Sequence, residues 1–341
     1  MPRLSALLLG AFCVSTFIAP AHADTDAHTA LESVAHLDKY QVVELRRYDI
    51  APGQRDRFVR YFDAYFPEAF EQLDCMVFGQ FEDRAASTKF VWLRGYHDIN
   101  ARPVADAAFY YGPVWREHRV KVNALFPGAS DNVLLLRPLT PQTGIPVLPA
   151  VDPADEPHGA HGVAIAQIFA VKKGDEDEFA QRAQTAFARY GNANVHSAGV
   201  LVTLDVPNNF PQLPVRTDGP FLVWLGVVED DAALKRFEAL ASDVEHSLEE
   251  TGMLRGTPER LVLDPTPRSR LRWWPVADAK NSSTNNETVR VESFDKLGTS
   301  YMSEAKLREV EAPEIPHPMA LRTFGAMLSA NGSTDSSKPT R

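Results

Sequence analysis

The chain has 341 residues, a formal net charge of −10, 44% hydrophobic residues and 23% charged residues. At roughly 150 residues per domain, this length predicts about two domains, and the hydrophobic share excludes a wholly disordered chain. No segment is rich in lysine and arginine. Neither nucleic acid nor an anionic membrane is therefore an expected partner, because both require a basic surface.

The first 23 residues are typical of a secretory signal. Arg3 gives a positive start, residues 4–19 are mostly apolar, and residues 21–23 read Ala-His-Ala. This pattern predicts a signal peptide over residues 1–23 and an exported mature chain, periplasmic or secreted, that begins at Asp24. The apolar run is shorter than the ~20 residues of a spanning helix, so no integral membrane segment is expected.

Residues 24–39 form a polar leader, and a patterned block follows over residues 40–140. Alternation of apolar and polar residues predicts strands, and aromatic residues spaced by three and four predict helices. The predicted order is strand 41–48, helix 54–73, strands 75–81 and 89–96, helix 101–125 and strand 133–136. This β-α-β-β-α-β order is that of a ferredoxin-like unit.

The same order returns after a Pro-rich linker at residues 141–161. Over residues 162–275 we predict strand 163–171, helix 175–193, strands 198–204 and 221–228, helix 231–251 and strand 260–263. PGQRDRF in the first block aligns with KGDEDEF in the second, and FVWLRGYHD aligns with LVWLGVVED. Two matches in register indicate an internal duplication. Residues 276–341 are predicted to be a mostly disordered tail.

Three segments, VVELRRYDIAPGQRDRF, FVWLRGYHDINAR and FYYGPVWREH, resemble the NIPSNAP family. The resemblance covers about residues 40–139, and covers the second block only weakly. It implies the dimeric α+β-barrel superfamily, in which two ferredoxin-like sheets close face to face. The expected fold class is therefore α+β, with two tandem ferredoxin-like units forming an intrachain pseudo-dimeric α+β barrel. The family supplies no agreed catalytic motif, and Tyr111-Gly112-Pro113 replaces the acidic segment usual there.

Strand alternation suggests a candidate site. One side of the first strand carries Val43 and Leu45, and we expect the other side, with that of the third strand, to face the barrel interior. That second side offers Glu44, Arg46, Tyr48, Trp92, Arg94 and Tyr96. The aligned residues of the second block have largely lost this polar character: they are Ile165, Gln167, Phe169, Trp224, Gly226 and Val228.

The two arginines of this set suit an anionic group, because a guanidinium can hold it through two hydrogen bonds. The three aromatic rings could enclose an aromatic or otherwise planar ligand. The alternative is that Glu44 simply pairs with Arg46 or Arg94, as burial requires. An open cavity would favour the ligand, and a closed ion-paired layer would favour a scaffold.

Two functions therefore stay open. The first is an exported NIPSNAP-like protein that binds a small anionic or aromatic molecule or acts as a scaffold. The second is an oxygenase- or isomerase-type enzyme of the superfamily, some members of which hold haem through a histidine. No catalytic residue or metal site is assigned, although His158 and His161 lie near acidic residues in the linker. A homo-oligomer is also left open.

The signal sequence gives a first testable prediction. N-terminal sequencing of the protein from its native host should begin at Asp24, because cleavage follows the small residue Ala23. Recovery of Met1 or Pro2 from mature protein would contradict export through this signal.

Overall fold

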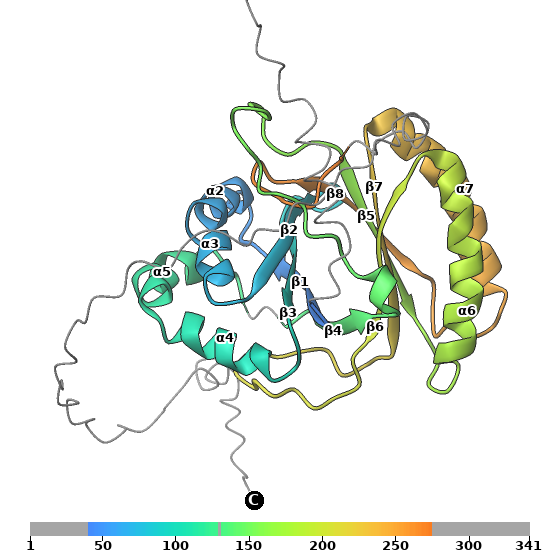
Figure 1. Cartoon of the computed structure of the whole chain (residues 1–341), viewed down its shortest axis with the longest axis horizontal. Helices are drawn as coiled ribbons and strands as arrows, with labels where there is room; N and C mark the ends of the chain where they lie inside the picture. The colour runs from blue at the N-terminus through green and yellow to red at the C-terminus, as the bar shows by residue number, and fades with distance from the viewer. Residues whose placement is uncertain (1–39, 129–130, 275–341) are drawn as a thin grey trace, which may run out of the picture.

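The computed structural model describes residues 40–128 and 131–274 (Figure 1). The predicted signal peptide, leader and C-terminal tail lie outside the described residues. Within those residues, no helix is long and apolar enough to cross a membrane.

The first half contains the predicted β-α-β-β-α-β order, with each helix divided in two. Its elements are β1 (Val42–Asp49), α2 (Arg55–Tyr65), α3 (Pro67–Glu71), β2 (Met76–Asp83), β3 (Lys89–Tyr96), α4 (Ala101–Tyr110), α5 (Pro113–Asn123) and β4 (Val133–Pro138). Both divisions occur at a proline, because proline has no N–H to donate to the preceding turn of the helix. Each proline instead starts the next helix, where its missing N–H is not needed.

The second half repeats this order. After η1 (Pro141–Thr143) come β5 (Val163–Ala170), α6 (Glu176–Phe187), η2 (Ala188–Ala193), β6 (His196–Thr203), β7 (Phe221–Val228), α7 (Asp231–Glu249) and β8 (Glu259–Pro265). The aligned glycines Gly53 and Gly174 both have positive φ angles, 73° and 98°, shortly before a helix. The second strand of each half also carries an irregularity at the same place, before Gly79 and before Gly199. The two halves are therefore repeated units.

The two sheets close into one eight-stranded antiparallel barrel in the order β1-β3-β2-β8-β5-β7-β6-β4. The joints between the halves are β2 with β8 and β4 with β6. Helices α2–α5 cover the outside of the first sheet, and α6 and α7 cover the outside of the second (Figure 1). Closure leaves no unpaired edge among the strands of the described ranges, and the predicted intrachain α+β barrel is confirmed.

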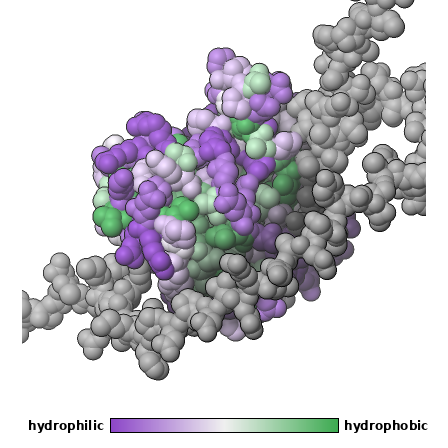
Figure 2. All heavy atoms as spheres, turned by 60° about the vertical axis from the view of Figure 1, so that its left-hand side comes forward, coloured by the Kyte–Doolittle hydropathy of each residue, from purple (hydrophilic) through white to green (hydrophobic). Residues whose placement is uncertain are grey.

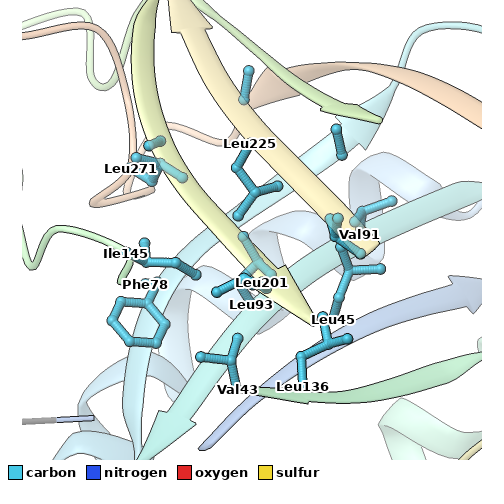
Figure 3. Close-up of a cluster of buried hydrophobic side chains, with 14 of the residues drawn as sticks. Val43, Leu45, Phe78, Val91, Leu93, Leu136, Ile145, Leu201, Leu225 and Leu271 are labelled. Carbon is cyan, nitrogen blue, oxygen red and sulfur yellow. The ribbon is translucent and has the colours of Figure 1, made fainter. Parts of the chain in front are cut away.

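The barrel interior is an apolar core shared by both halves. Figure 3 shows Val43, Leu45, Val91 and Leu93 of the first half in one cluster with Leu201 and Leu225 of the second. Two segments that follow a last strand also enter this cluster. Ile145, Val147 and Leu148 come from the predicted linker, and Leu271 follows β8. The start of the linker is thus part of the core.

A core of this kind predicts a strong effect of side-chain truncation. Leu93→Ala should lower the free energy of unfolding by about 2–5 kcal/mol, because the closed barrel cannot collapse onto the cavity. Val104→Ala is the control: Val104 is 71% exposed on α4, and its loss should change stability by less than about 0.5 kcal/mol. Urea unfolding of both variants measures the difference, and equal effects would contradict a packed interior.

Candidate functional site

The six predicted site residues lie together, but outside the barrel. The rings of Tyr48, Trp92 and Tyr96 pack in one buried cluster with Phe58 of α2 and Phe109 of α4, apart from the core of the barrel interior. The prediction that this polar side faces the barrel interior is therefore wrong. The physical reason is that the interior is enclosed by both sheets and takes aliphatic side chains, whereas α4 can supply charged partners on the outer side.

Glu44 is the centre of the cluster. Its carboxylate accepts hydrogen bonds from Arg46 Nη1 at 2.7 Å, Arg94 Nε at 2.6 Å and Arg102 Nε at 2.7 Å. All four side chains are fully or almost fully buried. Burial alone would raise the pKa of Glu44, but the three guanidiniums together hold that pKa well below its usual range. Glu44 therefore stays ionised.

Asp106 is a second carboxylate with the opposite tendency. Tyr96 Oη donates to Asp106 Oδ1 at 2.8 Å, and Arg94 Nη1 lies 3.1 Å from the same oxygen. Burial raises the pKa of Asp106, and the negative charge of Glu44 adds to this, although Arg94 opposes it. Asp106 is thus the member of the cluster that takes up a proton most readily.

The sequence prediction missed two members, Arg102 and Asp106. Both come from α4 and are spaced by four residues, so they lie on the same face of the helix. That spacing was visible in the predicted helix 101–125. Nothing in the sequence showed that this face covers β1 and β3, and so the connection to Glu44 required the structure.

The cluster carries more positive than negative charge. With three guanidiniums and two carboxylates, the excess is one positive charge, and it becomes two when Asp106 is protonated. Several buried polar atoms have no hydrogen-bond partner within the described ranges: Arg94 Nη2, Arg102 Nη2, Asp106 Oδ2 and Trp92 Nε1. Arg94 Nη1 is held by its ion pair with Asp106. An unpaired buried donor costs about 1–3 kcal/mol, so the site has N–H groups available for a ligand.

Aromatic rings enclose the arginines. The Arg94 guanidinium carbon lies 5.2 Å from the centre of the Trp92 ring and 5.4 Å from those of Phe70 and Tyr96. Arg46 donates from Nε to Tyr48 Oη at 3.0 Å. All six predicted residues are thus brought together, and ring faces near a guanidinium stabilise its charge.

The aligned positions of the second half also face outward, beneath α6 and α7. Ile165, Phe169, Trp224 and Val228 belong to the apolar cluster there, and a Cβ on Gly226 would lie within 2.2 Å of the Trp224 ring. The aligned Gln167 is buried, accepts from Tyr190 Oη at 2.8 Å and donates to Glu245 at 2.6 Å. Glu245 in turn pairs with Arg260, so this smaller network has balanced charge.

Cys75, His118 and His196 are potentially reactive side chains whose surroundings the structure defines. Burial raises the pKa of the Cys75 thiol to about 12, so the thiol is not a nucleophile near neutral pH. His118 accepts or donates a 2.5 Å hydrogen bond with Tyr61 Oη, and His196 stacks on Trp273. A haem requires an enclosed pocket with an axial ligand. No histidine lines the hollow at Asp131, Asn132 and residues 216–218 or the hollow near the ends of β1 and β4, so these two hollows do not fit a haem.

A scan against protein-family models finds no match for this sequence. A search of curated proteins finds no match either. Among solved structures, similar chains include a candidate monooxygenase from Fusobacterium nucleatum, 12% identical, with a TM-score of 0.46, covering 67% of this chain and 94% of that one. A chlorite dismutase mutant from Candidatus Nitrospira defluvii is 12% identical, with a TM-score of 0.41 and coverage of 72% and 96%.

A haem-binding protein from Thermus thermophilus is 11% identical, with a TM-score of 0.35, covering 67% of this chain and 91% of that one. The fold assignment rests on this chain's own strand order. The chain has a dimeric α+β-barrel fold. Both halves of the barrel are present in a single chain.

The opposite pKa shifts of the two carboxylates give a testable contrast. Glu44→Gln should lower the free energy of unfolding at neutral pH by about 3–5 kcal/mol, because it leaves three buried guanidiniums without their shared anion. Asp106→Asn should lower it less, since burial raises the pKa of Asp106 and so disfavours its charged form.

The directions of the two pKa shifts determine how stability depends on pH. Stability supplied by Glu44 is present above its unfolded pKa of about 4.3 and is lost as pH falls, so Glu44→Gln should flatten the acid side of the stability curve. Asp106 acts in the other direction: stability is present below its unfolded pKa of about 3.9 and is lost as pH rises through its raised folded pKa. The free energy of unfolding of Asp106→Asn, relative to that of the wild type, should therefore be most favourable at higher pH. Urea unfolding over roughly pH 3 to pH 9 measures the pH dependence of stability for both variants. Identical stability curves for Glu44→Gln and Asp106→Asn would contradict the opposite pKa shifts of the two carboxylates.

Proposed function

We propose that this chain is an exported, NIPSNAP-like binding protein for a small anionic molecule. The ligand is held by the arginine cluster between the first sheet and its helices. The charged residues form a closed, ion-paired layer, which by itself favours a scaffold. The observation that carries an anion site instead is the buried excess of positive charge, together with the unpaired Nη2 groups of Arg94 and Arg102. Uncompensated buried charge is unfavourable, and a bound anion would neutralise it. The family resemblance and the export belong to the same proposal and rest on the sequence segments.

The chemistry of the cluster indicates which anions suit it. A carboxylate or nitrate can accept two hydrogen bonds from one guanidinium in a planar arrangement. One excess positive charge matches a monovalent ion, and the neighbouring rings of Trp92 and Tyr96 favour an ion that is weakly hydrated. The cluster is fully buried, so the ion must be small. Formate and nitrate meet all three conditions.

The alternative is an isomerase-type enzyme, and one observation favours it. Asp106, whose pKa is raised mainly by burial, lies beside Arg94 and the Tyr96 hydroxyl. A group of this kind can accept a proton from a carbon next to a carbonyl while a guanidinium stabilises the oxyanion that forms. Exchange of such a proton in deuterated water, lost in Asp106→Asn, would test this function. An oxygenase is favoured by no residue described here.

Binding by the arginine cluster predicts a measurable loss. Isothermal titration of the mature chain with formate should show saturable binding, and Arg94→Ala should weaken it by roughly ten- to a hundredfold, as expected for one charge-assisted hydrogen bond. Arg260→Met is the matched control, because Arg260 pairs with Glu245 in the second half. It should leave formate binding unchanged.

A double variant serves as the control for a loss of stability in Arg94→Ala. Glu44→Gln with Arg94→Met removes one charge of each sign, which preserves the charge excess while removing the anion contact. If this variant folds normally and binds formate as tightly as the wild type, the ligand site lies elsewhere and the cluster is only a structural ion-pair network.

A further inference from the structure

Helix α4 has its charged residues on its buried side. Arg102 and Asp106 are the only charged residues of this helix, and both are fully buried. Arg102 binds Glu44, and its Nη1 also donates to the side-chain oxygens of Asn208 and Asn209 in the β6–β7 loop, at 2.9 and 3.1 Å. The charges of α4 are therefore used inside the protein, and none is available on its outer side.

The outer side of α4 carries an apolar row. Val104 is 71% exposed, Ala108 is exposed, and Tyr111, directly after the helix, is 47% exposed. Spacings of four and three residues place them along one face of the helix. A surface helix of a globular protein usually has the reverse arrangement, with its apolar face buried and its polar face in water. Helix α4 is thus inverted, and its exposed row is not suited to water.

The other exposed apolar residues lie on the same half. Within the described ranges, four of the five large hydrophobic residues that are exposed belong to α2, α4, α5 and the turn between α4 and α5: Tyr65, Val104, Tyr111 and Val120. The fifth, Val206, lies in the β6–β7 loop, which contacts α4. Figure 2 shows the side of the molecule that carries these helices, where polar and apolar side chains are interspersed.

Exposed cations accompany these apolar residues. Five arginine and lysine side chains of α2 and α5 are exposed and form no ion pair with any described residue: Arg57, Arg60, Arg116, Arg119 and Lys121. The exposed carboxylates of the two helices are those of Asp56 and Glu117, so the excess is three positive charges.

The two helices are in contact, so their cations belong to one surface. The ring of Tyr65 on α2 stacks on His118 of α5 at 4.2 Å, and Tyr61 Oη lies 2.5 Å from His118 Nδ1. No single segment of the sequence is rich in lysine and arginine, but the fold brings together two short groups that are about 60 residues apart. The surface is therefore basic although the chain as a whole is acidic.

The helices of the second half have a different surface. Helices α6 and α7 carry eight acidic and three basic residues, and no large hydrophobic residue on them is exposed. A second copy docked on this acidic surface would leave Val104 and Val120 without an apolar partner. A second copy docked through α4 and α5 themselves would bring Arg116 and Arg119 against like charges, which is unfavourable. A bilayer with anionic lipids meets both requirements, because it offers negative headgroups above an apolar layer.

We propose that α2, α4 and α5 form a surface that binds peripherally to bilayers containing anionic lipid. Val104, Tyr111 and Val120 enter the boundary between headgroups and acyl chains, while Arg116 and Arg119 interact with the lipid phosphates. This surface is separate from the buried arginine cluster, so the inference does not depend on the proposed anion binding. It would hold the chain at a membrane that no described helix can cross.

The test is co-sedimentation of the full mature chain with vesicles. Vesicles of phosphatidylcholine mixed with phosphatidylglycerol should bind at least about tenfold more tightly than vesicles of phosphatidylcholine alone, because each cation near an anionic surface adds to the attraction. Arg116→Gln with Arg119→Gln should weaken this binding by about tenfold or more. The matched control is Lys235→Gln with Arg236→Gln, which removes two exposed cations from α7 and should change binding by less than about twofold.

The apolar row is tested separately with Val104→Asp. This variant should bind the phosphatidylglycerol vesicles about tenfold more weakly, since a carboxylate there opposes both apolar insertion and the attraction to anionic lipid. Ala232→Asp is its control, at an exposed position of α7, and should change binding by less than about twofold. Urea unfolding of each variant shows that a loss of binding is not a loss of folding, because substitutions at exposed positions have small effects on stability.

The outcomes decide the proposal without reference to formate binding. Binding to neither kind of vesicle overturns it, and so does equal binding to both kinds. Equal losses in the α5 and α7 double variants would place the membrane contact elsewhere. If the wild type binds no vesicle but forms oligomers in sedimentation velocity that dissociate in the Arg116→Gln, Arg119→Gln variant, the surface is an interface between copies of the chain instead.

Discussion

One buried carboxylate, Glu44, fixes the arrangement of the first half. It lies opposite Arg94 in the pairing of β1 with β3, and it also binds Arg102 of α4. Strand, neighbouring strand and helix therefore meet at a single charged group. Because a buried ion pair stabilises a fold only when its geometry is good, α4 has little freedom to shift over the sheet. The position of the β6–β7 loop follows, since that loop is held by Arg102.

The two halves share one fold but differ in the layer between sheet and helices, which is charged in the first half and mostly apolar in the second. In the first half, Arg94 lies among the rings of Trp92, Phe70 and Tyr96. In the second half, the position aligned with Arg94 is Gly226, and the ring of Trp224 lies over it and stacks on Phe237. An indole ring thus fills the space that a guanidinium fills in the other half. That replacement removes a buried charge at this position, and the side chain that α7 packs against the indole ring is the apolar Phe237.

Much of the fold could be predicted from the sequence, because the signals that define it are local and periodic. Strand alternation placed β3 and β7 at their observed bounds, and the matched FVWLRGYHD and LVWLGVVED segments indicated the duplication. Alternation could not predict which face of the sheet lies inside the barrel. Alternation shows that Glu44 and Val43 point to opposite sides, but it does not show which side is enclosed. That depends on what α4 offers across the sheet, and Arg102 and Asp106 are distant from Glu44 in sequence. The contact of Asn208 and Asn209 with Arg102 joins residues still farther apart in sequence, and no local sequence pattern indicates it.

The joint between β2 and β8 has a consequence for how the chain reaches its final state. These strands pair through Phe81–Asp83 and Leu263–Pro265, which are separated by most of the described chain. Such long-range pairing closes slowly, because the entropy of the intervening chain must be lost before the contact forms. During synthesis, the barrel therefore cannot close until β8, the last strand, has emerged. Before closure, aliphatic side chains of the nascent first half are exposed to solvent and prone to aggregation. A chaperone that binds exposed aliphatic strands would act on this part of the chain.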